Sequence, residues 1–484
     1  MSKAPSATVP VPEQASLLRR LTLVDSLMLL VGGIAGSAIF MTARDVARAL
    51  PSPAMFLLVW VIGGAVSLLA CFAFAELGAM YPEAGGQYVY LREAYGELTA
   101  FLYGWMYFSV VGSGSVGIIA VACASYLGVM MPVLSERHIV WNAGTWQVSR
   151  TQVAAIGIIA LVTLINVLGV KRAAVLQNIA TWLKYAAMLG FAALGLALGS
   201  GSWSHFHATP ATASAPLHGW ALISGFGVAL IAVFWAYDGW VYIGQAAGEV
   251  QRPERNIPLA LIGGILMVAV IYIAINATYL FALPLNAIAS GESTTAEAAA
   301  AVLFSSAAGW WMSALVAVSC LGALSSAVLT GARVSYALAA DGQFFRALAR
   351  VHPRWRTPAL ALVVQAIWSS ILALSGRYDQ LFTFLMFVQV LSYALAVAGV
   401  VVLRRKRPQL ARPYRCPGYP WVPALYCVTA VAWAGNTLWQ SPRESLYGVA
   451  IVVLGLPGYF YWRRARPAAG ATQPADRPQS QAAR

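Results

Sequence analysis

Two apolar stretches of the chain are interrupted by small residues. Each interruption would free backbone N–H and carbonyl groups, which can bind charged groups of a ligand. The first runs from Gly32 to Phe40 and reads GGIAGSAIF, and the second runs from Trp235 to Trp240 and reads WAYDGW. A helix start favours an anion at its free N–H groups, and a helix end favours a cation at its free carbonyl groups. The two breaks therefore predict a site for a small ligand that carries both charges.

Two ionisable side chains fall deep inside apolar stretches, where a charge is costly and by default suggests function. Asp238 has three open roles: it pairs with a cationic group of the ligand, it binds a proton, or it caps N–H groups that the break frees. Lys184 lies several residues from the end of its stretch, so its ammonium needs acceptors within the protein. The loss of a proton from a buried lysine keeps proton coupling open as well.

The elements that position these groups are membrane-spanning helices. Hydrophobic residues make up 60% of the 484 residues, charged residues only 10%, and the mean hydropathy is +0.70. A span needs about 20 mostly apolar residues. We expect an all-α integral membrane protein with twelve transmembrane helices, near residues 22–46, 54–80, 98–131, 151–170, 178–199, 218–247, 257–283, 309–340, 359–375, 379–403, 419–440 and 445–462.

The net charge of +14 is explained by membrane orientation rather than by binding to nucleic acid. Most of the 31 Lys and Arg residues fall on one side of the predicted spans, and basic residues in short loops mark the cytoplasmic side. We therefore expect a multi-pass protein of the plasma (inner) membrane with both termini in the cytoplasm. The cytoplasmic ends are an N-terminal segment, 1–21, and a disordered tail, 463–484. The basic runs 346–356 and 404–407 are interpreted as topology anchors.

The sequence lacks the residues that a metal site or an intramembrane enzyme would need. The five cysteines form no CxxC pair, and all five histidines fall in loops or at the ends of predicted spans, so we expect no metal site and no cofactor. An intramembrane enzyme would need a nucleophile with a base or paired carboxylates. The spans supply one carboxylate and no histidine, so we expect no enzyme. The first apolar segment is too long for a signal peptide, and we expect no cleavage.

The two breaks belong to an internal repeat. A Gly-Gly pair follows each break at a similar distance, at Gly63-Gly64 and at Gly263-Gly264. Five spans separate the breaks, so the units 22–200 and 218–403 have opposite orientations, and 419–462 falls outside the repeat. Broken helices at matching places in two inverted units are typical of the substrate site of a secondary transporter.

Several motifs, in order, resemble the amino acid-polyamine-organocation superfamily and, within it, the L-type amino-acid transporters. The resemblance covers most of the chain. The motifs are GSAIF at 36–40, AELG at 75–78, PEAGGQY at 82–88, YLREAYG at 90–96, AYDGW at 236–240, GEVQRPERNIP at 248–258, and Arg333 with AADG at 339–342.

The resemblance implies how the breaks bind an amino acid. The N–H groups around Ser37, Ala38 and Ile39, with the Ser37 hydroxyl, would hold the carboxylate. Carbonyl groups near Ile34 and over 235–238 would hold the ammonium. The implied substrate-binding set is Ile34, Gly36, Ser37, Ala38, Ile39, Trp235, Ala236, Tyr237, Asp238 and Gly239. Trp235 stands where relatives carry an aromatic gate. The family usually has Gly where this chain has Ala38, which either narrows the pocket or changes nothing.

The resemblance also bears on energetics and partners. Lys184 would replace the sodium ion of sodium-coupled relatives, with carbonyls near Gly32 and Gly33 and the hydroxyls of Ser325 or Ser326 as partners. Family light chains bind a glycoprotein through a loop cysteine that 132–150 lacks, so we expect a monomer or homodimer without a disulfide-linked heavy chain. The expected function is sodium-independent exchange or facilitated transport of neutral amino acids. Alternatives are proton symport, transport of cationic amino acids or polyamines, and an amino-acid receptor of the same fold.

Overall fold

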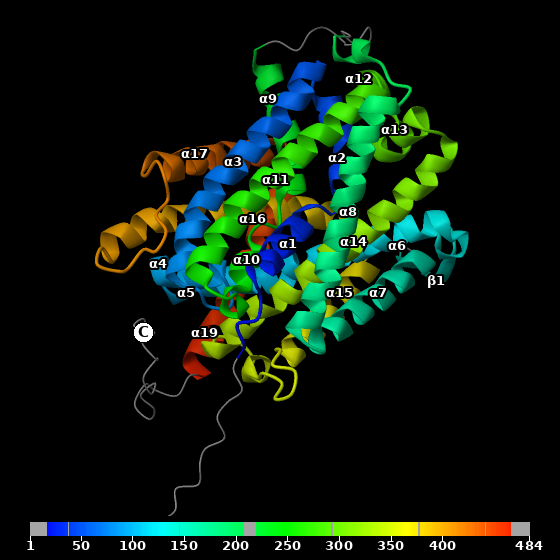
Figure 1. Cartoon of the computed structure of the whole chain (residues 1–484). Helices are drawn as coiled ribbons and strands as arrows, with labels where there is room; N and C mark the ends of the chain where they lie inside the picture. The colour runs from blue at the N-terminus through cyan, green and yellow to red at the C-terminus, as the bar shows by residue number, and fades with distance from the viewer. Residues whose placement is uncertain are drawn as a thin grey trace, which may run out of the picture.

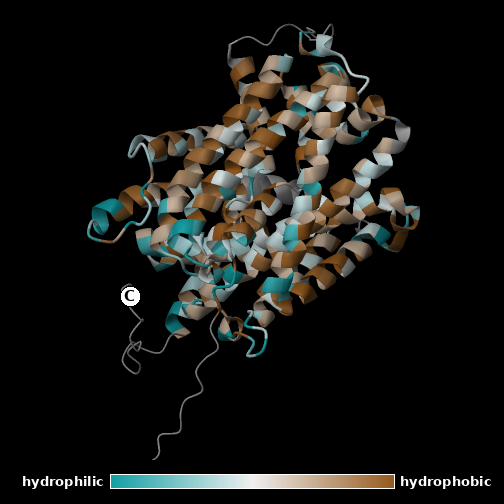
Figure 2. Cartoon of the chain, in the orientation of Figure 1, coloured by the Kyte–Doolittle hydropathy of each residue, from teal (hydrophilic) through white to brown (hydrophobic). Residues whose placement is uncertain are grey.

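The computed structural model describes residues 17–36, 38–144, 146–207, 219–291, 294–375, 378–440 and 442–465. In these ranges the chain is mostly helical, and long helices pack side by side (Figure 1). Hydrophobic residues cover most of their length, and hydrophilic residues gather toward helix ends and loops (Figure 2). This arrangement suits a protein whose helices face lipid.

Eight helical stretches of the described residues are long and apolar enough to cross a membrane, or nine if one bent pair counts as a single span. The bent pair is α1 (Leu23–Ile34) with α2 (Ala38–Ala49). The eight are α3 (Pro53–Met80), the stretch of α5 (Glu97–Met106), η1 (Tyr107–Val111) and α6 (Gly112–Met130), α7 (Arg150–Val167), α8 (Val170–Leu198), α11 (Pro253–Ala282), α14 (Ser306–Ala340), α16 (Tyr378–Lys406), and α18 (Pro442–Val453) with α19 (Gly455–Ala465).

The other predicted spans correspond to helices that are shorter or less apolar. These are α9 (Trp220–Tyr237), α15 (Ala359–Leu374) and α17 (Trp421–Gln440). Short elements connect the long helices: α4 (Gln87–Tyr95), η2 (Pro132–Leu134), η3 (Trp203–Phe206), α10 (Tyr242–Gln245), η4 (Ala247–Glu249), α12 (Leu285–Ser290), α13 (Thr295–Leu303) and η5 (Arg346–Ala349).

The expectation of a purely helical chain needs one correction. Strands β1 (Ile139–Ala143) and β2 (Trp146–Ser149) form an antiparallel hairpin between η2 and α7. Ile139, Val140 and Trp141 favour extended backbone, and Gly144 supplies a positive φ of 67° at the turn. All of β1 is exposed, so this strand lies over the surface outside the core.

Local sequence explains where the helices that carry the site begin. Thr22 accepts a hydrogen bond from the Asp25 N–H, and the Asp25 carboxylate accepts one from the Thr22 N–H, which is a capping box at the start of α1. Ser52 caps α3 in front of Pro53, and Pro253 opens α11. The helices that follow the two breaks, α3 and α11, lie along one another, and α1 packs against α8, α11 and α14.

Candidate substrate site at two helix breaks

The first break separates α1 from α2. Helix α1 ends at Ile34, the Gly36 N–H donates to the Ile34 carbonyl at 2.8 Å, and α2 starts at Ala38 with its axis bent by 42° from that of α1. Ala38 and Ile39 are buried in the first turn of α2, where N–H groups have no partner within the helix. Ser37, the predicted partner of a carboxylate, lies outside the described residues.

The second break ends α9. The Asp238 N–H folds back onto the Trp235 carbonyl at 3.1 Å, and Gly239 follows with a φ of +111° before the chain turns into α10. Backbone of this kind is rarely adopted by a residue with a side chain, which explains the glycine. Ala236, Tyr237 and Gly239 are buried, and Trp235 is half-buried.

The two breaks touch each other. A methyl group on Gly239 would lie 2.9 Å from the carbonyl carbon and oxygen of Gly33 and 3.0 Å from the Ile34 nitrogen. A methyl group on Gly33 would lie 2.4 Å from the ring of Tyr242. The glycines therefore let two backbones, more than 200 residues apart in sequence, come into contact.

One tyrosine ties both breaks together. The Tyr272 hydroxyl of α11 lies 2.9 Å from the Ala236 carbonyl oxygen and 3.4 Å from the Ile34 carbonyl oxygen. These are among the carbonyls that the sequence assigned to a ligand ammonium. A carbonyl oxygen has two lone pairs, so the Ala236 carbonyl keeps room for a second donor beside Tyr272, whereas the Ile34 carbonyl already accepts from the Gly36 N–H as well. Sequence reasoning missed Tyr272, because nothing in a helical tyrosine reveals which way it points.

Lys184 lies fully buried against the first break. Its ammonium donates to the Gly32 carbonyl at 2.7 Å and to the Ala35 carbonyl. Its neighbour Tyr185 donates to the Val31 carbonyl at 3.0 Å. Two adjacent residues of α8 thus donate to carbonyl oxygens at the end of α1, and the Val31 carbonyl also accepts from the Ala35 N–H at 3.1 Å.

The serines of α14 divide differently from the prediction. Ser319 donates to the Ala35 carbonyl at 2.8 Å and so shares an acceptor with Lys184. Ser326 donates instead to the Leu29 carbonyl at 3.1 Å, and within the described ranges the Ser325 hydroxyl has no hydrogen-bond partner. As partners of Lys184, Ser325 and Ser326 were therefore predicted wrongly. Ser319 lies about two turns earlier on α14, at the level where α1 ends.

The Asp238 side chain is hydrogen-bonded to α16. Its carboxylate accepts a hydrogen bond from the Tyr393 hydroxyl of α16 at 2.6 Å, and Trp240 packs against Tyr393 with 4.7 Å between ring centres. The Asp238 side chain lines a pocket among four helices. The other lining residues are Trp240, which follows the second break, Val66 and Ser67 of α3, Phe234 of α9, Gln389, Val390 and Tyr393 of α16, and Tyr426, Thr429 and Ala430 of α17. Phe234, and not Trp235, is the aromatic residue of α9 in this lining.

Comparison with known proteins decides the family. A sequence profile of amino acid permeases matches residues 21–456. This chain belongs to the amino acid permease family. It is similar to the serine/threonine exchanger SteT of Bacillus subtilis, with 32% identity over 93% of this chain and 98% of that protein. It also resembles the human cystine/glutamate transporter, at 28% identity, and the human b(0,+)-type amino acid transporter 1, at 29%, over 93% of this chain and 86% and 89% of theirs.

In this permease, a buried ion pair holds the chain just after the second break. Arg333 of α14 donates to both carboxylate oxygens of Glu249, at 2.8 and 3.1 Å, and both side chains are fully buried. The Glu249 carbonyl accepts from the N–H groups of Arg20 and Leu21, each at 2.8 Å. The segment after the second break is thereby joined to α14 and to the segment that leads into α1.

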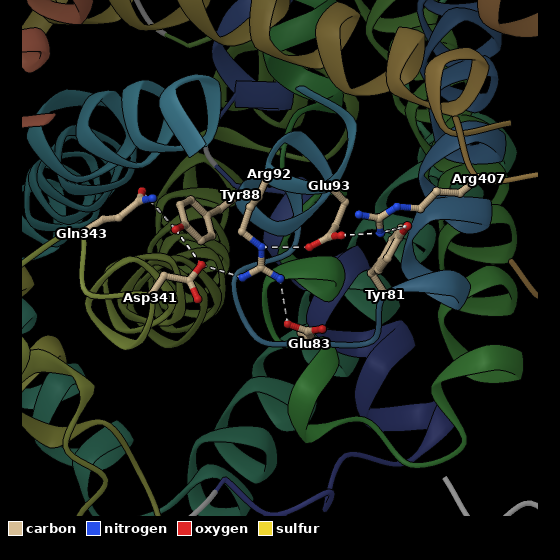
Figure 3. Close-up of polar contacts among 8 residues, drawn as sticks. All are labelled: Tyr81, Glu83, Tyr88, Arg92, Glu93, Asp341, Gln343 and Arg407. Atoms are coloured by element: carbon tan, nitrogen blue, oxygen red, sulfur yellow. Dashed lines mark hydrogen bonds and ion pairs between the residues drawn. The ribbon is translucent and has the colours of Figure 1, made fainter. Parts of the chain in front are cut away.

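A second charged cluster of the permease joins α4 to the ends of α14 and α16 (Figure 3). Arg92 contacts Glu83, Glu93 and Asp341, and Glu93 also accepts from Arg407 at 2.6 Å. Burial alone would raise the pKa of Glu93, but the hydrogen bonds from Arg407 and Arg92 outweigh it and lower that pKa. Four of these residues, Glu83, Arg92, Glu93 and Asp341, belong to the motifs that carried the resemblance, and the structure places them as a clasp between helices.

Proposed function

We propose that this permease carries neutral amino acids across the membrane by alternating access, without sodium, as an exchanger or a facilitator. The observation that carries the proposal is the contact of the two helix breaks at Gly33 and Gly239. Two broken helices that meet put freed N–H groups and freed carbonyl groups within reach of one small molecule. An α-amino acid presents the matching carboxylate and ammonium.

The roles within this site follow the polarity of the half-helices. The N–H groups at the start of α2, with Ser37, Ala38 and Ile39, bind the carboxylate. The carbonyls of Ile34 and of 235–238 bind the ammonium, and Trp235 covers the side chain as a gate. Gly36 and Gly239 keep the backbone accessible.

Lys184 supports independence from sodium. Its ammonium already occupies the carbonyl oxygens of Gly32 and Ala35, which a sodium ion would otherwise use as ligands. A fixed cation supplies the positive charge at every stage of the cycle. In the proposed architecture, twelve spans form two inverted units of five, both termini are cytoplasmic in the plasma membrane, and the chain works without a disulfide-linked partner and without enzymatic activity.

One relative favours exchange of neutral substrates, because it is named as a serine/threonine exchanger and both of these amino acids are neutral. One observation favours a second candidate function. The Asp238 carboxylate lines a pocket, and an acid there fits the side chain of a cationic amino acid or a polyamine. Proton symport and an amino-acid receptor of the same fold are the further outcomes of the test.

The test uses purified protein in liposomes that are either empty or loaded with unlabelled amino acids. Entry of a labelled panel is followed with and without sodium and with an inward proton gradient. Uptake only into loaded vesicles, unchanged by sodium, supports exchange and names the substrates. Uptake into empty vesicles at a rate that does not depend on the proton gradient supports facilitated transport. Uptake whose rate increases with the gradient shows symport. If only arginine, lysine or polyamines entered the vesicles, the proposal of neutral substrates would be replaced by one of cationic substrates. Binding without uptake would show a receptor.

A further inference from the structure

Five of the ten residues that line a pocket away from the two breaks are basic. Three distant segments form it: the approach to α1, the connection of α7 to α8, and the loop between α14 and α15, which share one end of the molecule (Figure 1). Its basic residues are Arg20, Lys171, Arg172, Arg354 and Arg356, and Leu18, Leu168, Gly169, Val170 and Trp355 complete the lining.

Little of this positive charge is neutralised. Lys171 forms an ion pair with Asp25 at 2.9 Å. Among the described residues, the side chains of Arg20, Arg354 and Arg356 form neither a hydrogen bond nor an ion pair. Arg172 makes only a long bond, 3.5 Å, to the Leu168 carbonyl. Four arginine side chains therefore gather around one hollow without a carboxylate to balance them, and such a gathering repels itself unless an anion joins it.

The backbone holds the basic residues together in spite of that repulsion. Arg356 has a φ of +55°, which is costly for a residue with a side chain. Its N–H donates to the His352 carbonyl at 2.9 Å, and the His352 N–H donates to the Thr357 carbonyl at 2.8 Å. The Thr357 hydroxyl then donates to the Val167 carbonyl of α7 at 2.9 Å, which fastens the loop beside the start of α8.

The start of α8 adds to the same charge. This helix of 29 residues begins at Val170, and no side chain caps it, because its N-cap residue is Gly169 at a φ of +133°. N–H groups at the start of a long helix attract phosphate and other anions. The guanidinium groups around it present paired donors that match two phosphate oxygens, which an ammonium does not do as well.

We propose that this pocket binds a phosphate-bearing anion. Two sources share that chemistry, the headgroup of an acidic phospholipid and a soluble phosphate compound. The positive charge of the lining suits either source. Leu18, Val170 and Trp355 add apolar surface that an acyl chain would use and a soluble phosphate compound would not. The site does not depend on which amino acid the permease carries.

The test compares two double variants of the full chain in neutral detergent. Arg20→Gln with Arg354→Gln removes two pocket charges whose side chains make no hydrogen bond. Arg20 and Arg354 are exposed, and the control Arg405→Gln with Arg463→Gln removes two charges that are also exposed and lie at other helix ends, outside the pocket. Native mass spectrometry measures retention of phosphatidylglycerol against phosphatidylcholine. We expect the pocket variant to bind phosphatidylglycerol roughly tenfold more weakly than the wild type, and the control variant to stay within about twofold.

Inorganic phosphate separates the two sources. If millimolar phosphate displaces phosphatidylglycerol from the wild type, both probes bind at the same site and the lipid is its ligand. Phosphate that raises the unfolding temperature of the wild type but not of the pocket variant, without preference for phosphatidylglycerol, shows a site for a soluble compound. Equal losses in both double variants, or a pocket variant that binds both probes like the wild type, would overturn the proposal. Arg172→Gln repeats the test should the pocket variant unfold at a lower temperature without ligand.

Discussion

Gly239 contacts the backbone of Gly33, so that two helix ends more than 200 residues apart in sequence meet without a side chain between them. In the proposed mechanism the contact matters because it would bring the freed carbonyl and N–H groups of both breaks within reach of one substrate. It also makes the breaks interdependent, since neither backbone can shift without moving the other. Tyr272, which reaches carbonyl oxygens on both sides, strengthens that dependence.

A methyl group at position 239 should break this contact. In Gly239→Ala the new Cβ would lie 2.9 Å from the Gly33 carbonyl, and the φ of +111° would strain the backbone. We expect destabilisation of roughly 1–3 kcal/mol, as for overpacked interiors, and loss of uptake. Thermal unfolding followed by tryptophan fluorescence and uptake into liposomes measure both effects.

Gly263→Ala is the matched control, because its Cβ would meet no atom within 4 Å and it lies in a helix that alanine suits better. Equal stability and uptake for Gly239→Ala and Gly263→Ala would contradict the idea that the breaks must touch.

Lys184→Met tests the fixed cation beside the first break. The change keeps much of the volume but leaves the Gly32 carbonyl without its donor, and bonds to a charged group contribute about 1.5–3 kcal/mol. We expect sodium-free uptake to fall by about tenfold or more. Uptake is compared in sodium and in choline buffers, because a vacated cation site is the place where sodium would restore function.

Tyr185→Phe serves as the comparison for that variant. It removes a neutral hydrogen bond from the next residue of α8 to the Val31 carbonyl of the same helix end. A neutral bond contributes about 1 kcal/mol, so the loss of uptake should be smaller. If the two variants lost the same activity, the charge of Lys184 would have no special role.

The clasp around Glu93 predicts a dependence of stability on pH. The folded pKa of Glu93 lies below its ordinary value of 4.5, so its contribution is complete above that pH and is lost as the pH falls through the lowered pKa. Glu93→Gln should therefore lower the unfolding temperature at pH 7 and make the fall in stability below pH 4.5 less steep. Unfolding temperatures between about pH 3 and 7 test this.

Glu254→Gln is the control for the clasp, because Glu254 is exposed near the start of α11. Its curve should follow the wild type at every pH. A Glu93→Gln curve that did the same would show that the contacts with Arg92 and Arg407 add nothing to stability.

The positions of the two breaks could be predicted from the sequence, but several of the side-chain contacts around them could not. Small residues mark both breaks in the sequence, and helix ends fall at Ile34 and Tyr237, inside the stretches that the sequence singled out. The serine that shares the Ala35 carbonyl with Lys184 could not be chosen from the sequence, because α14 carries several serines and the packing of the helix decides which of them reaches α1. The partner of Asp238 lies 155 residues away, at a distance where local pattern carries no information.

Asp238→Asn separates the two candidate substrates. The amide keeps the size of the side chain and can still accept from the Tyr393 hydroxyl, but it removes the charge from the pocket. If Asp238 is structural and the substrates are neutral, uptake of serine or leucine should stay within about threefold of the wild type, a change of less than 1 kcal/mol. Tyr393→Phe, which deletes the same contact from the other side, should behave alike. Abolished uptake of arginine or lysine in Asp238→Asn, with uptake retained in Tyr393→Phe, would assign the carboxylate to a cationic substrate and replace the neutral one proposed above.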